Sequence, residues 1–126
     1  MIDAIRRALS GLLPLSIEEA SFTDPTLTLA GPGWALTSVS PWRVTRDGVL
    51  LYGWSDRGAL RRVVEMGGRS ILSVMAPSSL MRGDPAFELS GGDWLETFSD
   101  HAVDPWVLRL PSMTFVGSPS DPTWVQ

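Results

Sequence analysis

The residues that could support chemistry are few in this chain of 126 residues. The only histidine is His101, which is flanked by Asp100 and Asp104 in a polar stretch. A neighbouring carboxylate raises the pKa of an imidazole and suits it to act as a base or a pH-sensitive contact. A typical metal site needs a second histidine, and the sequence has none. We therefore expect a solvated loop first, a partner contact second, and a metal ligand or catalytic base last.

The nearest approach to a nucleophile motif is Ser55, in the stretch GWSDRG at residues 53–58. This stretch has one residue too many for the G-x-S-x-G elbow, and it does not follow the strand-turn-helix pattern of an α/β sheet. We expect the end of a strand that leaves through a turn.

Two carboxylate pairs have the residue types of a glycosidase, namely Glu18 with Glu88 and Asp93 with Glu96. The sequence alone does not place either pair at a working separation. Lys and Cys are absent, which removes the P-loop lysine, the Schiff base, the thiolate nucleophile and the cysteine zinc site. We expect a protein that is not an enzyme and uses no cofactor and no metal.

Six tryptophans are the most unusual feature of the composition. Four of them belong to an internal repeat and are predicted to be core and corner residues: Trp34, Trp42, Trp94 and Trp106. Trp54 and Trp124 lie outside the repeat. Exposed aromatic side chains stack on sugars and anchor protein partners, so these two are the candidate ligand-stacking residues.

The charge balance favours a protein partner. The formal net charge is −4, which disfavours nucleic acid because neutralising phosphates requires clustered basic residues. A basic protein is the expected partner. The predicted contact residues are Glu96, Asp100, His101 and Asp104, in a segment where the second copy of the repeat carries extra residues, since insertions in repeats often carry function.

These residues must be positioned by a mainly β framework. Apolar residues three and four apart predict an N-terminal helix over residues 1–13, which Pro14 ends. Short apolar runs separated by Gly, Pro, Asp and Ser then predict antiparallel strands. The predicted strands cover 15–22, 26–30, 34–39, 49–54, 69–76, 86–90, 94–99, 106–109 and 113–116. A short second helix is allowed between residues 56 and 68, with Leu60, Val63 and Val64 on one face.

Two segments of eleven residues are similar: DPTLTLAGPGW at 24–34 and DPAFELSGGDW at 84–94. When the segments are aligned end to end, Leu27 matches Phe87 and Trp34 matches Trp94. Pro32-Gly33 favours a type II turn in the first copy, and Gly91-Gly92 a type I′ turn in the second. The Pro-Trp pairs at 41–42 and 105–106 follow each copy.

The repeat predicts the architecture. A unit of about 50 residues buries too little apolar surface alone, so two units are expected to share one core. We predict a single mainly β (α+β) domain in which two antiparallel units, related by a pseudo-twofold axis, form a sandwich or partly open barrel. Its parts are the helix at 1–13, a first unit at 15–58, a second at 68–117 and a flexible tail at 118–126. With no targeting segment, membrane span or cysteine, a cytoplasmic location is expected.

The pattern W-x-L followed by Pro-Trp-Arg, together with GRSILSV at 68–74, resembles small uncharacterised β-rich bacterial proteins of the polymorphic-toxin immunity type. This resemblance implies an immunity protein, an inhibitor that binds another protein. It transfers no site residue, because its motifs fix turns and core positions. We expect a small acidic protein-binding module; the alternative is a β-sandwich that binds a small ligand or carbohydrate through exposed Trp.

Overall fold

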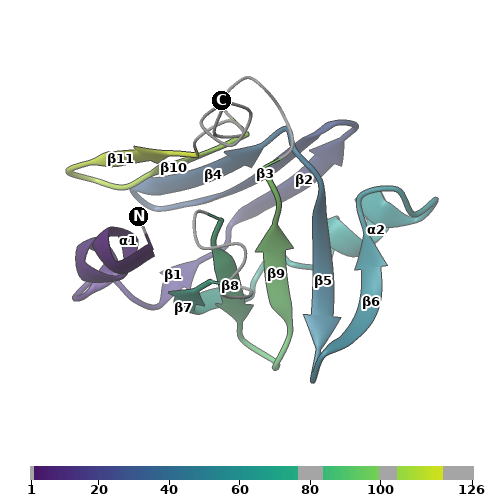
Figure 1. Ribbon diagram of the computed structural model, residues 1–126, viewed down its shortest axis with the longest axis horizontal. Helices are drawn as coiled ribbons and strands as arrows, with labels where there is room; N and C mark the ends of the chain where they lie inside the picture. Colours follow the sequence, from purple (N-terminus) through teal and green to yellow (C-terminus); the bar gives the residue numbers. More distant parts are fainter. Residues whose placement is uncertain (1, 77–83, 100–104, 118–126) are drawn as a thin grey trace, which may run out of the picture.

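The computed structural model describes residues 2–76, 84–99 and 105–117. In these ranges the chain forms two antiparallel sheets that stack as a sandwich and do not close into a barrel (Figure 1). This is the predicted fold class.

The larger sheet, sheet A, has the strand order β1-β7-β8-β9-β5-β6. Its members are β1 (Leu15–Ser16), β7 (Ser70–Met75), β8 (Ala86–Leu89), β9 (Trp94–Thr97), β5 (Trp42–Arg46) and β6 (Val49–Gly53). Sheet B has the order β11-β10-β4-β3-β2 and consists of β11 (Thr114–Val116), β10 (Trp106–Arg109), β4 (Trp34–Ser38), β3 (Thr26–Gly31) and β2 (Glu19–Thr23). Strand β5 is the one that the sequence does not predict.

Helix α1 (Ile2–Leu9) packs beside β7. Its residues Ile2, Ile5 and Leu9 are buried, as the three-and-four spacing predicts. The helix is shorter than predicted because the chain turns at Gly11, which has a φ of +90°.

The second helix is α2 (Ala59–Val64), which packs against β2. The apolar face predicted for it is wrong. Ala59 and Val63, four residues apart, are buried against the sandwich, whereas Leu60 and Val64 are exposed. The helix thus presents two large apolar side chains to solvent.

The run predicted as one strand over 15–22 is two strands in different sheets. β1 pairs with β7 in sheet A, and β2 pairs with β3 in sheet B. The chain changes sheet at Ile17, whose N–H donates to the Arg69 carbonyl (2.9 Å), and Glu18, whose N–H donates to the Ala30 carbonyl (2.8 Å). One apolar run therefore forms a corner between the sheets.

Each sheet is completed by strands from the other half of the chain. Strands β2, β3 and β4 are extended by β10 and β11, and strands β7, β8 and β9 are extended by β5 and β6. Matching backbone hydrogen bonds hold the two crossings: Val39 N–H donates to the Pro105 carbonyl (2.9 Å), and Phe98 N–H to the Pro41 carbonyl (3.0 Å). The strand order has the twofold pattern that the repeat implies.

The residue matching inside the repeat is wrong around the hairpins. Leu29 lies opposite Leu36 in sheet B, as Phe87 lies opposite Leu95 in sheet A. The strands that cross from the other half pair Leu108 with Leu36 and Val44 with Leu95. Leu36 and Leu95 therefore occupy equivalent positions in the two sheets. Phe87 therefore corresponds to Leu29, 58 residues earlier, and not to Leu27.

The cause of this shift is the turn. Gly31 pairs with Trp34 around the predicted type II turn, in which Gly33 has a φ of +77°. In the second copy Leu89 N–H donates to the Asp93 carbonyl (2.8 Å), which leaves a loop of three residues, Ser90 to Gly92, and not the predicted two-residue type I′ turn.

The longer loop turns Trp94 away from the core. Because neighbouring residues of a strand face opposite sides and Leu95 is buried, Trp94 lies on the outer face of sheet A, where it is half-buried. Trp34 is buried, and its Nε1 donates to the Ser16 carbonyl (3.0 Å). The prediction that Trp94 is a core residue equivalent to Trp34 is therefore wrong.

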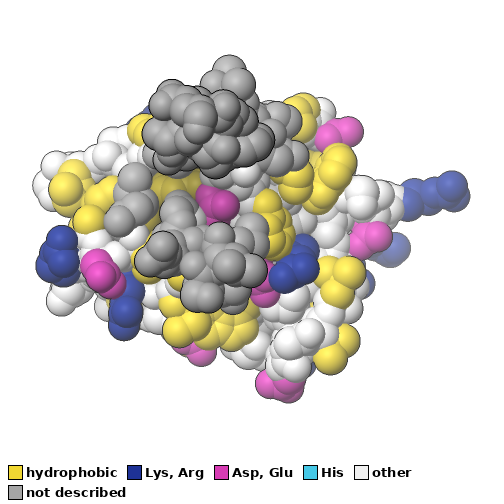
Figure 2. Space-filling model, in the orientation of Figure 1, with side chains coloured by type: hydrophobic (Ala, Val, Ile, Leu, Met, Phe, Trp, Pro, Cys, Tyr) yellow, Lys and Arg dark blue, Asp and Glu magenta, His cyan; other side chains and the backbone are white. Residues whose placement is uncertain are grey.

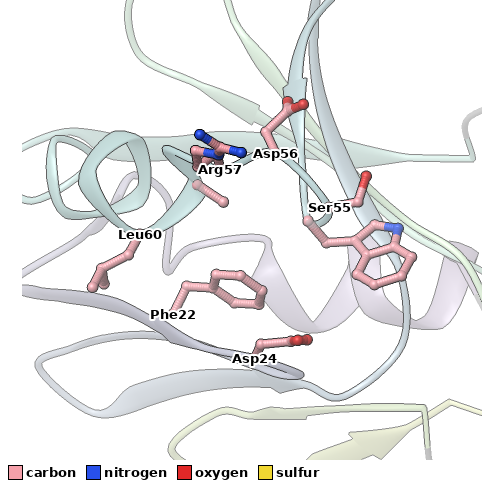
Figure 3. Close-up of a pocket in the computed structure, with 8 residues that line it drawn as sticks. Phe22, Asp24, Ser55, Asp56, Arg57 and Leu60 are labelled. Atoms are coloured by element: carbon pink, nitrogen blue, oxygen red, sulfur yellow. The ribbon is translucent and has the colours of Figure 1, made fainter.

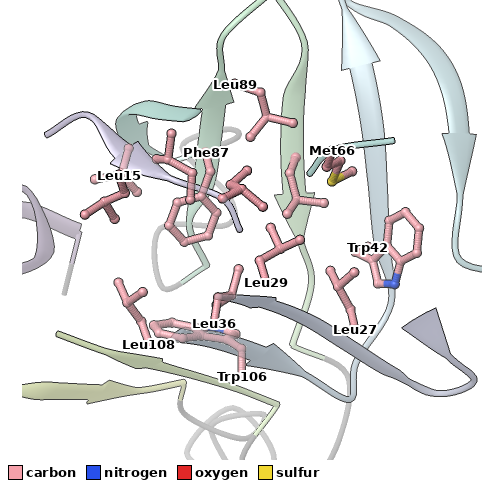
Figure 4. Packing of buried hydrophobic residues seen from close by; sticks show 14 of the residues in the cluster. Leu15, Leu27, Leu29, Leu36, Trp42, Met66, Phe87, Leu89, Trp106 and Leu108 are labelled. Carbon is pink, nitrogen blue, oxygen red and sulfur yellow. The ribbon is translucent and has the colours of Figure 1, made fainter. Parts of the chain in front are cut away.

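The core lies between the sheets (Figure 4). Leucines of sheet B face Phe87 and Leu89 of sheet A, and the indoles of Trp42 and Trp106 belong to the same core. Both tryptophans are almost fully buried, as their place in the Pro-Trp corners predicts.

The two corner tryptophans differ in their hydrogen bonds. Trp106 Nε1 donates to the carboxylate of Asp84 (3.3 Å), which also accepts from the backbone N–H (2.9 Å) and the hydroxyl of Ser99. Trp42 Nε1 is buried and has no acceptor among the described residues. A buried N–H without a partner costs free energy, whereas a bond to a carboxylate stabilises the fold.

We predict that Trp106→Phe lowers the free energy of unfolding by about 1–3 kcal/mol more than Trp42→Phe, because only the first change removes a hydrogen bond to a charged acceptor. Both changes remove the same ring volume, so each variant controls for the packing loss of the other. Urea unfolding followed by circular dichroism measures the difference. Equal losses would show that the Asp84 bond contributes nothing.

Candidate functional site

The most exposed aromatic side chain among the described residues is Trp54, which directly follows β6. The residue is 43% exposed. The backbone leaves the sheet here in a tight turn: Asp56 accepts from the Gly53 N–H through its carboxylate (2.7 Å), and Asp56 N–H donates to the Gly53 carbonyl (3.0 Å). This turn fixes the direction in which Trp54 leaves the sheet and caps the last backbone donor of β6.

A cavity of about 450 Å³ lies on one side of Trp54. Its floor is apolar, formed by the buried residues Phe22 and Ala59. Figure 3 shows Phe22 and Asp24 on one side, facing Arg57 and Leu60 on the other. The complete lining is Phe22, Asp24, Trp54, Ser55, Asp56, Arg57, Ala59 and Leu60.

A second depression of about 200 Å³ lies on the other side of the same indole. Leu50 of β6 and Phe98 line it together with Arg43, whose guanidinium lies 4.9 Å from the centre of the Phe98 ring. Trp54 therefore borders two hollows, each lined by apolar and charged groups.

An aromatic chain supports this surface from below. The rings of Phe22 and Trp42 meet edge to face at 5.2 Å, and those of Trp42 and Tyr52 at 6.1 Å. On the far side, the Arg62 guanidinium of α2 covers the Tyr52 ring at 4.4 Å. These contacts connect β2, β5, β6 and α2, so the groups around Trp54 rest on a rigid base.

An apolar patch surrounds Trp54. We call it the Trp54 patch, and it consists of Leu50, Trp54 and Leu60, which are all exposed and which line the two hollows. Leu50 shares the smaller hollow with Trp54, and Leu60 shares the larger one, so the patch is continuous across the indole. Hydrophobic side chains lie over β6 in Figure 2. Charged residues Asp24, Asp56, Arg57 and Arg43 form its rim.

Of the residues predicted to contact a partner, the structure describes Glu96. Its carboxylate accepts from Arg43 Nε (2.9 Å) and from the Thr45 hydroxyl (2.7 Å), and its side chain is 13% exposed. Glu96 thus orients Arg43 at the edge of the smaller hollow. Asp100, His101 and Asp104 lie outside the described residues, as does Trp124, so the predicted acidic loop stays a prediction.

The other chemical candidates are not assembled into a site. Asp93 and Glu96 lie on opposite faces of sheet A. Side chains alternate along a strand, so the inward-pointing Leu95 puts Glu96 on the outer face and Asp93, two residues before Leu95, on the inner face. Asp93 is held by Arg46 (2.6 Å) and Arg69 (3.2 Å).

Glu88 accepts from the Ser73 hydroxyl (2.9 Å), whereas Glu18 is exposed at the corner of the other sheet. Ser55 is exposed in the turn after β6 and has no described hydrogen bond to a base. Within the described ranges, no three or more His, Asp or Glu residues gather in a way that would hold a metal ion.

Sequence reasoning identified Trp54 and missed its surroundings. Phe22 and Asp24 belong to a hairpin far from Trp54 in the sequence, so only the fold brings them together. The signal for Leu50 was present: the run VLLYGW at 49–54 does not alternate as a half-buried strand should, which marks apolar side chains that the core cannot take.

No family model matches the chain, and neither the curated proteins nor the solved structures contain a match to it. No helix in the described part of the chain reaches the length and hydropathy that crossing a bilayer requires. The geometry around Trp54 is therefore the basis for inferring a function.

Burial raises the pKa of Tyr52 to about 12, although the nearby Arg62 guanidinium opposes this by favouring the phenolate. An unfolded tyrosine ionises near pH 10. The stabilising contribution of Tyr52 is therefore complete below about pH 10 and is lost as the pH rises from about 10 to about 12, because the unfolded state releases its proton first.

We predict that stability falls across this window and that Tyr52→Phe abolishes the fall. The sequence makes the experiment specific: Tyr52 is the single tyrosine and the chain has no Lys or Cys, so no other side chain titrates there. Urea unfolding of both proteins at several pH values measures the effect, and the near-ultraviolet absorbance of tyrosinate reports the ionisation directly. A phenol that titrates near pH 10 in the folded protein would contradict the prediction.

Proposed function

We propose that this protein is a protein-binding module and that its interface is centred on Trp54. The observation that supports this is the Trp54 patch, an exposed apolar surface with a half-exposed indole at its middle and charged residues at its rim. Protein interfaces have this anatomy, in which a tryptophan or another large anchor contributes most of the binding energy and a polar rim excludes water.

The extent of the patch favours a macromolecular partner. Leu50 is 60% exposed and Leu60 is 51% exposed on opposite sides of Trp54. Covering the exposed half of a leucine side chain contributes about 1 kcal/mol relative to leaving it in water. A continuous apolar surface of this kind is costly unless another molecule covers it.

Within this class, an immunity-type inhibitor of a basic protein is the specific role that we propose. It is supported by the resemblance carried by the W-x-L, Pro-Trp-Arg and GRSILSV motifs and by the net charge of −4. Opposite net charges on two proteins increase the rate at which they associate. An inhibitor of this type needs a rigid surface and no catalytic groups.

A small-ligand or carbohydrate-binding role is the second candidate, and one observation favours it. The larger hollow places the Trp54 indole beside Ser55 and Asp24, which combines a stacking surface with hydrogen-bonding groups. A sugar would use this hollow and leave Leu50 uncovered. The two candidates therefore differ in whether Leu50 contributes to binding.

We predict that Trp54→Ala weakens binding to the protein partner by at least about 2 kcal/mol, as expected for an anchor at the centre of an interface. Leu50→Ala is expected to weaken it by about 1 kcal/mol. Met113→Ala is the matched control, because Met113 is exposed to a similar degree (48%) but lies between β10 and β11, away from the patch. Immobilised protein captures partners from the source cells, and calorimetry then measures each variant against the purified partner.

Three results would contradict the proposal. The first is capture of no protein at all, the second is a partner that binds the Trp54→Ala variant as well as the unaltered protein, and the third is an equal loss in the Met113→Ala control. A soluble glycan that quenches Trp54 fluorescence, with no effect of Leu50→Ala, would instead support the carbohydrate candidate.

A further inference from the structure

The larger hollow beside Trp54 has the chemistry of a pocket for one long, positively charged side chain. Its floor, Phe22 and Ala59, is apolar and buried, and Leu60 and Trp54 provide apolar walls. An aliphatic stem can lie along these groups, while a charged end reaches the rim. The volume of about 450 Å³ leaves room for the stem and its head group.

The charges at the rim favour a cation. Asp24, Asp56 and a single arginine, Arg57, line the hollow, and the Asp56 carboxylate is directed to the Gly53 N–H of its own turn. One oxygen of Asp56 accepts from the Gly53 N–H, so its second oxygen remains for another donor. Asp24 is exposed, and no described Arg lies within ion-pairing distance of it.

A comparison of the two halves shows why Asp24 is left in this position. In both halves Asp-Pro directly precedes a strand, β3 or β8, but the hairpin register makes Asp84 equivalent to Thr26, 58 residues earlier, and not to Asp24. Asp84 reaches the indole N–H of Trp106 and is buried.

In the first half this internal bond is missing. Trp42 Nε1 is buried without an acceptor among the described residues, behind Phe22, whose ring it meets edge to face. Asp24 remains in the turn at the mouth of the hollow. The position equivalent to Asp84 is Thr26, which has no carboxylate, so the first half lacks the acceptor that Trp106 has.

We propose that the hollow binds the side chain of an arginine presented by the protein partner, with the guanidinium between the Asp24 carboxylate and the Trp54 indole. This inference rests on the proposed protein-binding function. A guanidinium is planar, so it can stack on the indole while it donates to a carboxylate, and an ammonium group lacks this combination. The arginine stem lies over Phe22 and Leu60.

Arg57 disfavours the binding of a cation in this hollow. Its guanidinium lies across the hollow from Asp24 and repels an incoming cation (Figure 3). Replacing it by a neutral residue should therefore strengthen arginine binding, whereas replacing Asp24 by its neutral isostere should weaken it. Two changes of a single charge at the same rim thus give opposite results.

The experiment uses N-acetyl-arginine amide as the probe and follows the tryptophan indole signals of the full chain by ¹⁵N NMR. A Trp54→Phe variant assigns the Trp54 signal. We expect a saturable shift of that signal at millimolar probe, no shift with the uncharged citrulline analogue, and a smaller shift with N-acetyl-lysine amide at the same ionic strength. Asp24→Asn should weaken binding about fivefold, and Arg57→Gln should tighten it about twofold.

Equal responses to the arginine and citrulline probes, or unchanged binding by Asp24→Asn, would overturn the inference. An equal response to the lysine probe would overturn the choice of a guanidinium. The outcomes separate the two levels of the proposal. If binding of a protein partner depends on Trp54 but not on Asp24, the protein-binding function is supported and the arginine inference is overturned. If the arginine probe binds but no protein is captured, the hollow binds arginine and the protein-binding function is overturned.

Discussion

The two crossings at the Pro-Trp corners are the constraint on which the rest of the structure depends. At each crossing the chain leaves one sheet and enters the other, and a backbone hydrogen bond joins the end of one crossing to the Pro of the other. The tryptophan that follows each Pro is buried between the sheets. Neither sheet is complete without strands from both halves, so the sandwich behaves as one cooperative unit.

The same crossing builds the candidate site. Strand β5 enters sheet A at Trp42, and its hairpin partner β6 becomes the edge of that sheet. Trp42 then contacts both Phe22 of sheet B and Tyr52 of β6. Through these contacts the hairpin turn that holds Asp24 and the turn that holds Trp54 stand on either side of one hollow. The surface proposed for binding is therefore a product of how the halves interlock.

The sequence predicted the fold class and the helix at the N-terminus, because apolar spacing and turn residues are local signals. It did not predict β5, in which Arg43 and Arg46 interrupt the apolar pattern; both arginines are held by acids of the neighbouring β9 region, a contact that no local pattern shows. It also misjudged the register after Gly91-Gly92. Two glycines fit a loop of two or three residues equally well, and only the packing of Leu95 decides which forms.

For the site, the sequence singled out Trp54 because it lies outside the repeat, but it could not supply Phe22, Asp24 or Leu60 as neighbours. Exposure of Leu60 runs against the usual expectation that a large apolar residue on a short helix faces the core; Ala59 and Val63 take that role here. An exposed apolar residue of this kind indicates a functional surface most strongly when it also lines a hollow, as Leu60 does beside Trp54.

The interlocked order of the strands also bears on how the protein is made. During synthesis on the ribosome the first half emerges before the second, yet the β5–β6 hairpin has no sheet to join until β9 has been translated. Many of the stabilising contacts thus form between residues distant in the chain, which is typical of slow folders. Until β9 has been translated, the hairpin carries Trp42, Val44 and Tyr52 uncovered, although the folded core buries all three, and this is the period in which chaperones have the most to protect.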